Sequence, residues 1–365
     1  MNPEGRSPHR VLEIDALRFI AALMVVFFHW AFRGGATQHY TQAVYEPLMP
    51  AAKYGYLGVQ LFFMLSGFVI LMSAQSGSAR RFVVSRVVRL YPAFWVCCSL
   101  TAICIVLFAD PHFGVGLAQY LINMTMLSEF VAPDVRLVDG VYWSLFVEIR
   151  FYAMVLLVLA LGWLRHVERL LWLWLGVALV LQIAPDSRVS TWLLGHHAAL
   201  FIAGACCYLM HSQGVSRRRL ALLLASFPLA AYDAASGAAA VSQRYAPHVV
   251  DPWWPAALIA VFYVGLYVVS TRGIAVLRHP GMVACGALTY PLYLLHENIG
   301  FMVINRLHGR VQPHLLFWGL LAAMLLLAWV VHRYLERPIS AAMKRLIDAA
   351  LAARSPRRAA ALGQE

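Results

Sequence analysis

An arginine and a histidine frame one apolar run near the start of the chain. Between Arg18 and His29 every side chain is apolar. Such a run predicts a membrane-spanning helix, in which the helical rise places His29 about 16 Å beyond Arg18. If Arg18 lies near one membrane face, His29 lies past the midplane, where an ionisable group is costly and indicates a functional site. A histidine that only hydrogen-bonds to a neighbouring helix for packing is the alternative.

Two further apolar segments carry ionisable side chains. Glu148 and Arg150 lie in one, and His296 and Glu297 lie in another. Estimated depths are about 20 Å from the inner face for His29 and His296, and about 10 Å from the outer face for Glu148. In a hydrocarbon core about 30 Å thick, these three groups share one layer. Acid and base at one level predict a site for acid–base chemistry; a buried structural network is the alternative, and Glu297 could equally supply the charge.

A third group of side chains suits a phosphorylated ligand. Arg86 and Arg89 are three positions apart and share one face of a helix. Paired guanidinium groups bind phosphate through several hydrogen bonds, although an anchor beside lipid headgroups explains the same charges. Ser66 and Gly67 lie near the middle of another apolar segment, where small side chains leave room for a slender ligand or for close helix packing.

The composition is that of an integral membrane protein. Of 365 residues, 61% are hydrophobic and 13% are charged, whereas soluble domains are near a quarter charged. The formal net charge of +12 does not indicate nucleic-acid binding, because the basic residues cluster in short loops without interleaved aromatics. The six cysteines fall in apolar segments without metal-ligand spacing, so we expect packed free thiols and no metal.

These patterns predict an all-α fold, a polytopic transmembrane helix bundle of about ten spans. The expected spans are Leu17–Phe32, Tyr56–Ala74, Ala93–Ala109, Val141–Leu164, Leu170–Ala184, Trp192–Met210, Leu220–Ala235, Trp253–Ser270, Val283–Ile304 and His314–Tyr334. Gly114–Val131 is too broken to span and predicts an interfacial or re-entrant element. We expect a membrane domain over 14–338 between a cytoplasmic tail, 1–13, and a basic amphipathic tail, 339–365.

The basic residues predict the orientation of the bundle. With the N-terminus in the cytoplasm, the inner segments hold 19 Lys and Arg residues and the outer segments hold 7. Cytoplasmic loops of membrane proteins carry such an excess of positive charge. Both termini are therefore expected in the cytoplasm.

Five motifs in this order resemble the acyltransferase family 3 of membrane proteins. They are Arg18 through His29, Phe62-Phe-Met-Leu-Ser-Gly67, Arg86-Val-Val-Arg-Leu-Tyr-Pro92, Trp143-Ser-Leu-Phe-Val-Glu148 with Phe151-Tyr152, and Tyr290-Pro-Leu-Tyr-Leu-Leu-His296. Each motif is weak alone, but the resemblance runs from about Ile14 to Pro338. It implies transfer of an acyl group, usually acetyl from acetyl-CoA, to a hydroxyl of a sugar, a glycan or a related acceptor.

The layering and the resemblance together predict an O-acyltransferase of the bacterial inner membrane. Acyl-CoA would enter from the cytoplasm, and His29 would remove a proton from the acceptor hydroxyl while Glu148 orients the imidazole. The expected catalytic residues are His29, Glu148, Arg18 and His296, and the expected donor-binding residues are Arg86, Arg89, Ser66 and Gly67. A proton-coupled transporter that uses the same layer as a relay is the alternative.

Overall fold

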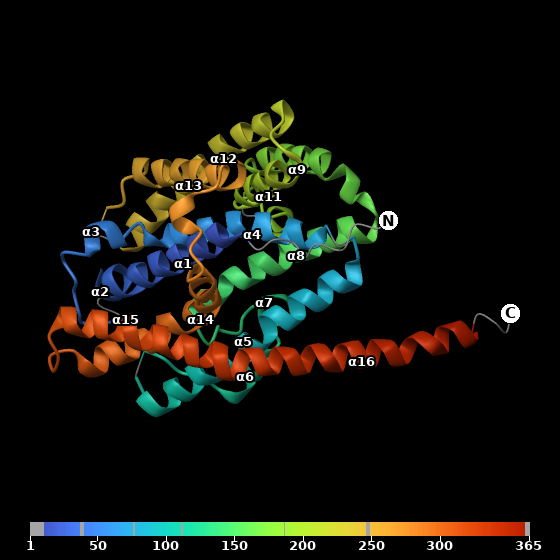
Figure 1. Cartoon of the computed structure of the whole chain (residues 1–365). Coiled ribbons are helices and arrows are strands. Elements are labelled where there is room, and N and C mark those ends of the chain that lie inside the picture. The colour runs from blue at the N-terminus through green and yellow to red at the C-terminus, as the bar shows by residue number, and fades with distance from the viewer. Residues whose placement is uncertain are drawn as a thin grey trace.

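All regular structure in the described part of the chain is helical. The computed structural model describes residues 11–36, 40–75, 77–110, 112–185, 187–245 and 249–361, with side chains to residue 353. Within these ranges it holds helices and no strand (Figure 1), which confirms the predicted all-α class. Residues 1–10 of the expected first tail, with Arg6 and Arg10, and residues 362–365 of the expected last tail lie outside the described residues.

Each expected span contains a helix. The long helices are α1 (Leu12–Phe27), α4 (Gly58–Ala74), α5 (Ala79–Phe108), α8 (Trp143–Ala160), α9 (Val167–Leu181), α11 (Ala198–Gln213), α12 (Arg217–Arg244), α13 (Trp253–Thr271), α14 (Met282–Leu307), α15 (Pro313–Val330) and α16 (Arg337–Ala361). The short helices are α2 (Gly34–Ala36), α3 (Met49–Ala52), α6 (Leu117–Met124), α7 (Ser128–Val131) and α10 (Arg188–Trp192). Single turns of other helix types are η1 (Phe28–Arg33), η2 (Gly55–Leu57), η3 (Gly140–Tyr142), η4 (Trp163–His166), η5 (Ala275–Leu277) and η6 (Val331–Glu336).

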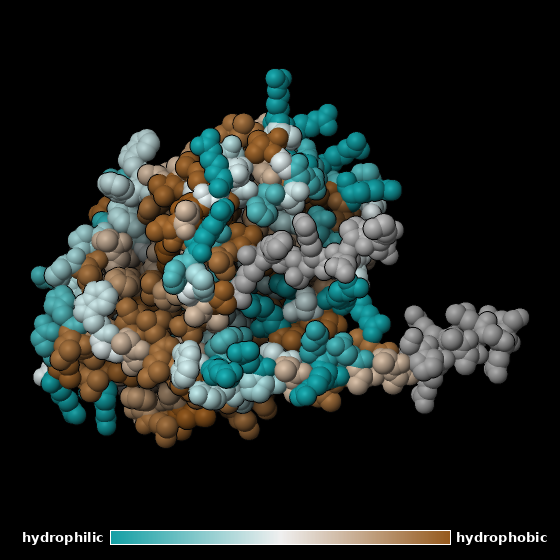
Figure 2. All heavy atoms as spheres, in the orientation of Figure 1, coloured by the Kyte–Doolittle hydropathy of each residue, from teal (hydrophilic) through white to brown (hydrophobic). Residues whose placement is uncertain are grey.

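Seven of the described helical segments are long and apolar enough to cross a membrane. They are Leu12–Ala36, Met49–Ala74, Ala79–Phe108, Gly140–Ala160, Arg217–Arg244, Trp253–Thr271 and Pro313–Ala353, and α11 is a shorter apolar helix. Hydrophobic side chains cover much of the face shown in Figure 2, and hydrophilic ones gather toward its left and right margins. The number of about ten spans and the cytoplasmic position of both termini stay predictions.

Two helices lie enclosed within the bundle. α14, near the centre of Figure 1, packs against α1, α5 and α15, and all its residues from Pro291 to Met302 are buried. α11 packs against α4 and α12, with every residue from Ala198 to Met210 buried. A helix enclosed by protein can carry polar side chains, because protein groups rather than lipid surround them.

α4 and α11 approach each other closely at two glycines. A Cβ at Gly67 would collide with the carbonyl oxygen of Phe201, and a Cβ at Gly204 would collide with that of Met64. Small residues allow membrane helices to bring their backbones into contact in this way. The contact fixes α4 against the interior of the bundle.

A widened turn continues α1 at the position of His29. The π-helical turn η1 follows α1 without a break and runs from Phe28 to Arg33. Such a turn holds one more residue than an α-helical turn, and it is frequent at functional sites. His29 and Arg33 therefore take directions that a regular helix would not give them.

The segment between α5 and α8 dips into the bundle. It begins at Asp110, whose Oδ2 accepts a hydrogen bond of 3.0 Å from Asn305 near the end of α14. Its middle is held by Tyr91 of α5, which donates to the carbonyl oxygen of Thr125 at 2.9 Å. Tyr290 contacts α5 next to Tyr91, and it lies on α14 about 22 Å before Asn305 by helical rise. This geometry supports the re-entrant alternative for the segment.

Asn123 holds the re-entrant segment together. The sequence Asn123-Met-Thr125 fits a glycosylation sequon, but Asn123 is 1% exposed. Its amide donates to the carbonyl oxygens of Gln119 and Arg136 at 2.9 and 3.1 Å and accepts from the backbone of Val138. The side chain is therefore occupied by the fold and is closed to a glycan.

α16 extends from the bundle as a long arm. The helical segment Pro313–Ala353 runs through α15, η6 and the first part of α16 (Figure 1). α16 packs against α5, where Ser340 donates to the carbonyl oxygen of Val88 at 3.1 Å. The described part of the expected basic tail is therefore helical, and the start of this helix is fixed to the bundle.

Candidate active site

His29 and His296 face each other from two helices. His29 lies at the start of η1 and His296 in the buried part of α14, with 3.0 Å between His29 Nδ1 and His296 Nε2. His29 Nδ1 also lies 2.8 Å from the carbonyl oxygen of Val25, and His296 Nδ1 lies 2.8 Å from that of Tyr293. The two histidines that the sequence placed in one layer are in direct contact.

These contacts assign the protons on both rings. A carbonyl oxygen only accepts hydrogen bonds, so His296 Nδ1 carries a proton that it donates to Tyr293. His296 Nε2 then has a lone pair, and His29 Nδ1–H donates to it and to the Val25 carbonyl. His29 Nε2 keeps its lone pair for another group, which is the state that a general base requires.

Glu297 is the acid beside His29. Its Oε2 lies 3.7 Å from His29 Nε2, and its Oε1 accepts a hydrogen bond from Arg33. Glu297 is 2% exposed, and the guanidinium offsets its charge in this buried place. An imidazolium formed at His29 would face a carboxylate already held in position.

A cavity of about 460 Å³ lies beside His29. Among the residues that line this outer cavity are His29, Tyr56, Gln60, Trp143, Tyr245 and Glu297. Three of its polar atoms, Tyr56 Oη, Gln60 Oε1 and Glu297 Oε2, are buried without a hydrogen-bond partner among the described residues. Each such atom costs about 1–3 kcal/mol unless a ligand or water satisfies it. The outer cavity is therefore a chamber suited to a ligand with several hydroxyl groups.

A second cavity, of about 280 Å³, holds the other predicted residues. Arg18, Ser66, Arg86, Arg89, Glu148 and Tyr152 line this inner cavity. Ser66 donates a hydrogen bond to Glu148, and Arg18 has Arg89 and Glu148 among its charged neighbours. Three guanidinium groups and two carboxylates, Asp15 and Glu148, give the inner cavity an excess of positive charge, which suits an anionic ligand.

A narrow space lies between the two cavities. This neck, of about 50 Å³, shares Arg18, Ser66 and Glu148 with the inner cavity. It shares Val59 and Tyr293 with the outer cavity. The three spaces are thus neighbours in the order inner cavity, neck and outer cavity, and they lie in a row between Arg89 and His29.

The acid that contacts His29 differs from the expected one. Glu148 is bonded to Ser66 at the inner cavity and neck, whereas Glu297 lies beside His29. Equal depth did not bring Glu148 to the imidazole, because depth does not specify toward which neighbour a helix turns its side chain. The sequence had left Glu297 open as the charge in this layer.

Gly67 also differs from its expected role. It faces α11 in the close helix contact and lines none of these three cavities, while Ser66 beside it lines two. Neighbouring positions on a helix point in different directions, so only one of the pair can face the ligand route. The packing alternative holds for Gly67.

The sequence did not single out Arg33, Tyr56 or Gln60. Arg33 was counted with the outer basic residues, although it lies four positions after His29 and so near the same helix face. Gln60 is the amide in the otherwise apolar start of α4, and that isolation was a usable signal. Tyr56 carries no comparable signal, since its hydroxyl could equally face water.

Arg150 has a structural role in the packing of the bundle. It is 6% exposed, forms an ion pair with Glu129 of α7, and lies 5.0 and 5.6 Å from the ring centroids of Phe130 and Trp192. A buried guanidinium with a carboxylate and aromatic partners fixes the packing of the segments that supply them. Arg150 thereby holds the re-entrant segment on α8.

The described side chains contain no group of three or more His, Cys, Asp or Glu residues that could hold a metal ion. All six cysteines are free thiols.

Comparison with known proteins identifies the family. A family profile described as an acyltransferase domain matches residues 11–333. Acyltransferase MdmB of Streptomyces mycarofaciens is 25% identical over 90% of this chain and 91% of its own length. Nodulation protein 10 of Rhizobium leguminosarum bv. viciae is 28% identical over 53% of each chain, so this chain spans about half the length of that relative. No solved structure gives a significant match. The chain belongs to this acyltransferase family and is an acyltransferase enzyme with membrane-type helices.

Proposed function

From this membership we propose that the enzyme moves an acetyl group from acetyl-CoA, through the neck, to a hydroxyl of a sugar or glycan in the outer cavity. The observation that carries the proposal is the free lone pair of His29 Nε2 among three unsatisfied polar atoms. A polyhydroxylated acceptor would satisfy those atoms while presenting one hydroxyl to the imidazole.

The donor enters by the inner cavity. Arg86 and Arg89 bind its phosphates, and Arg18 lies further along the route toward the neck. The pantetheine arm is long and thin, as the neck of about 50 Å³ requires. Ser66 and Glu148 offer hydrogen bonds to its amides at this point. The thioester carbon then reaches the neck beside the outer cavity.

Transfer proceeds in a ternary complex. The acceptor oxygen attacks the thioester carbon as its proton passes to His29 Nε2, so a C–O bond forms. The tetrahedral intermediate collapses with cleavage of the C–S bond, and the proton on His29 passes to the departing thiolate. The products are an ester and free CoA, and His29 returns to its first state.

Glu297 and His296 position and balance the base. Glu297 Oε2, 3.7 Å from His29 Nε2, stabilises the transient imidazolium, and Arg33 keeps the carboxylate in place. His296 Nε2 accepts from His29 Nδ1 and so fixes the tautomer of the base. The sequence analysis had assigned the orientation of the imidazole to Glu148 and had included His296 among the catalytic residues.

The aromatic surface of the outer cavity favours a sugar ring. Trp143 and Tyr245 line it beside Gln60 and Arg244. Aromatic faces bury the apolar side of a ligand while neighbouring polar groups bind its hydroxyls. We place the protein in the bacterial inner membrane with both termini in the cytoplasm, so that the donor comes from the inside and the acceptor from the outside.

The proposal is tested in sealed vesicles that contain the purified protein. Radiolabelled acetyl-CoA is supplied on the inner side, and a glycan extract from the membrane envelope is supplied on the other. Label on a glycan hydroxyl supports the reaction and its sidedness. Label that appears only when both substrates share one side would overturn the cross-membrane arrangement, and passage of unmodified substrate would favour the transporter.

Cysteine labelling tests the orientation separately. Val249 lies before the start of α13 and Val276 lies after its end, in η5, and they are 68% and 81% exposed. In a protein without its native cysteines, an impermeant thiol reagent applied outside should label Val249→Cys and not Val276→Cys. The reverse pattern would place the termini outside.

A further inference from the structure

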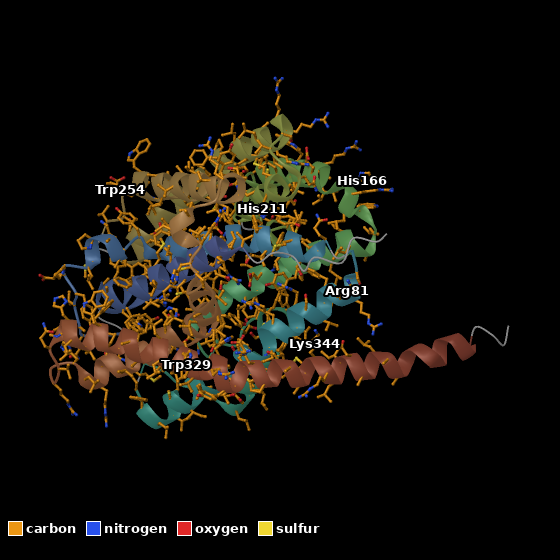
Figure 3. The ribbon with its side chains drawn as sticks, in the orientation of Figure 1. Arg81, His166, His211, Trp254, Trp329 and Lys344 are labelled. Carbon is orange, nitrogen blue, oxygen red and sulfur yellow. The ribbon has the colours of Figure 1, made fainter. Side chains whose placement is uncertain are left out.

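A groove lies between α5 and α16. It measures about 720 Å³ and is lined on one side by Arg80, Arg81 and Arg89 of α5, and on the other by Arg337, Lys344 and Asp348 of α16. Figure 3 shows Arg81 and Lys344 on these two elements. In Figure 2 hydrophilic side chains lie along the arm and the facing body of the protein. The volume is that of a site for a small organic ligand.

The groove carries an excess of positive charge that the protein does not neutralise. Five basic side chains line it, against Glu336 and Asp348. In the described part of the chain these five form no ion pair, whereas Glu336 is paired with His332 at 2.8 Å. Clustered, unpaired guanidinium and ammonium groups are suited to phosphate.

The groove adjoins the inner cavity at Arg89, which lines both. A molecule with its anionic end in the groove can extend past Arg89 toward Ser66 and the neck. A phospholipid headgroup would also suit the charges, but its chains must remain in the bilayer. A ligand with one slender polar arm fits this connection better. The groove wall also holds apolar side chains, Val84, Val88 and Leu351, against which a flat base can pack.

The wall formed by α16 is fixed in place and lies outside the family match. The family profile ends at residue 333, and α16 begins at Arg337. Ser340 ties α16 to α5 through the carbonyl oxygen of Val88. The residues that face α5, from Arg337 through Lys344 to Leu351, recur at helical spacing on one side of α16. α16 thus forms one fixed wall of the groove.

We propose that this groove binds the adenosine bisphosphate end of the acyl donor, with α16, which follows the segment matched by the family profile, as a clamp. The inference rests on the proposed function, because it assumes a donor of the CoA class. It assigns the nucleotide to Arg80, Arg81, Arg337 and Lys344, and it leaves the region of Arg86 and Arg89 to the diphosphate and the start of the arm.

The test compares two donors in vesicles of zwitterionic lipid. Arg81→Ala with Lys344→Ala should raise the KM for acetyl-CoA roughly tenfold, as expected for the loss of two charged contacts, and leave the KM for acetyl-pantetheine unchanged. The inhibition constant of adenosine bisphosphate should rise in proportion. Arg345→Ala removes an exposed charge of α16 outside the groove and is the matched control.

A second variant gives the opposite sign and does not depend on loss of activity. Asp348→Asn removes an acid from the groove and should lower the KM for acetyl-CoA about twofold. Equal effects on both donors, no change in either variant, or an effect that requires anionic lipid would each overturn the inference.

Failure of the proposed function would give a different result from failure of the inference about the groove. Wild-type protein would then use neither acetyl-CoA nor acetyl-pantetheine, and direct binding of adenosine bisphosphate, measured by calorimetry, would decide on the groove alone. Binding that the double variant loses supports the site; absence of binding to wild type overturns it.

Discussion

The two ends of the ligand route hold their charges in opposite ways. At the outer cavity, His29 and Glu297 are buried and fixed by His296 and Arg33. At the inner cavity, Arg86 is partly exposed and Arg89 is exposed. Groups that perform chemistry must be held in one geometry, whereas groups that capture a mobile anion need access and charge. The contrast supports the proposal that catalysis takes place at the outer end and donor binding at the inner end.

The largest effect is expected at the base. His29→Ala should lower turnover by about 10²–10⁴ while leaving expression and membrane insertion near normal. His211→Ala, a change on α11 away from the three cavities, is the control. Near-wild-type turnover in His29→Ala would remove the base assignment. A protein that fails to accumulate would favour a structural role for the histidine pair.

The two acids give the sharpest contrast between the ends. Glu297→Gln should lower kcat by roughly 10–100-fold, because the imidazolium loses its balancing charge at 3.7 Å. Glu148→Gln keeps a hydrogen-bonding group beside Ser66 and should act mainly on the KM for the donor. Steady-state kinetics of both variants show which of the two acids acts on kcat and which acts on the KM for the donor. If Glu148→Gln lowers kcat more than Glu297→Gln, the assignment made from the sequence is restored.

The arginines of the inner cavity should affect donor binding alone. Arg86→Ala with Arg89→Ala should raise the KM for acetyl-CoA roughly tenfold, and more at low ionic strength, where charge is least screened. A donor without nucleotide phosphates should be used about equally by wild type and variant. Equal loss with both donors would show that the arginines serve folding or topology.

The unsatisfied hydroxyl of Tyr56 in the outer cavity should affect binding of the acceptor. Tyr56→Phe should raise the acceptor KM about fivefold, since one hydrogen bond to the ligand contributes about 1 kcal/mol. The hydroxyl of Tyr45 is also buried without a hydrogen-bond partner among the described residues, but it does not line the outer cavity, so Tyr45→Phe is the matched control. Equal values in the two variants would contradict acceptor binding at Tyr56.

The smallest effect is expected outside the spans, at Asp110. Burial raises the pKa of this carboxyl group, but hydrogen bonds from Asn305 and His112 hold it below its ordinary value of 3.8. A carboxyl group whose pKa is lowered by folding stabilises the folded protein at any pH above its ordinary pKa. This stabilisation is lost as the pH falls from the ordinary pKa through the lower pKa of the folded state. Asp110→Asn should lower the melting temperature by about 2 °C or less at neutral pH. The melting temperatures of wild type and Asp110→Asn should differ at neutral pH and become equal at acidic pH. A difference between the two proteins that persists at acidic pH would contradict the role of the carboxylate.

Much of the fold followed from the sequence because it depends on local pattern. Unbroken apolar runs such as Phe19–Phe28 determine helices wherever they lie, and the charges in short loops mark their ends. The paired His29 and His296 were found in the same way, since an ionisable group in an apolar run is conspicuous. Each of these signals is contained in one segment and needs no knowledge of the neighbours.

The partner of His29 and the shape of the cavities were decided only by the tertiary structure. The sequence gives the depth of a residue along its helix, but the π turn at Phe28–Arg33 and the packing of α14 on α1 set its direction. For that reason Glu297 lies beside the imidazole, and Glu148 lies beside Ser66. The groove between α5 and α16 has the same origin, because Val88 and Ser340 in its two walls are 252 positions apart and meet only in the folded chain.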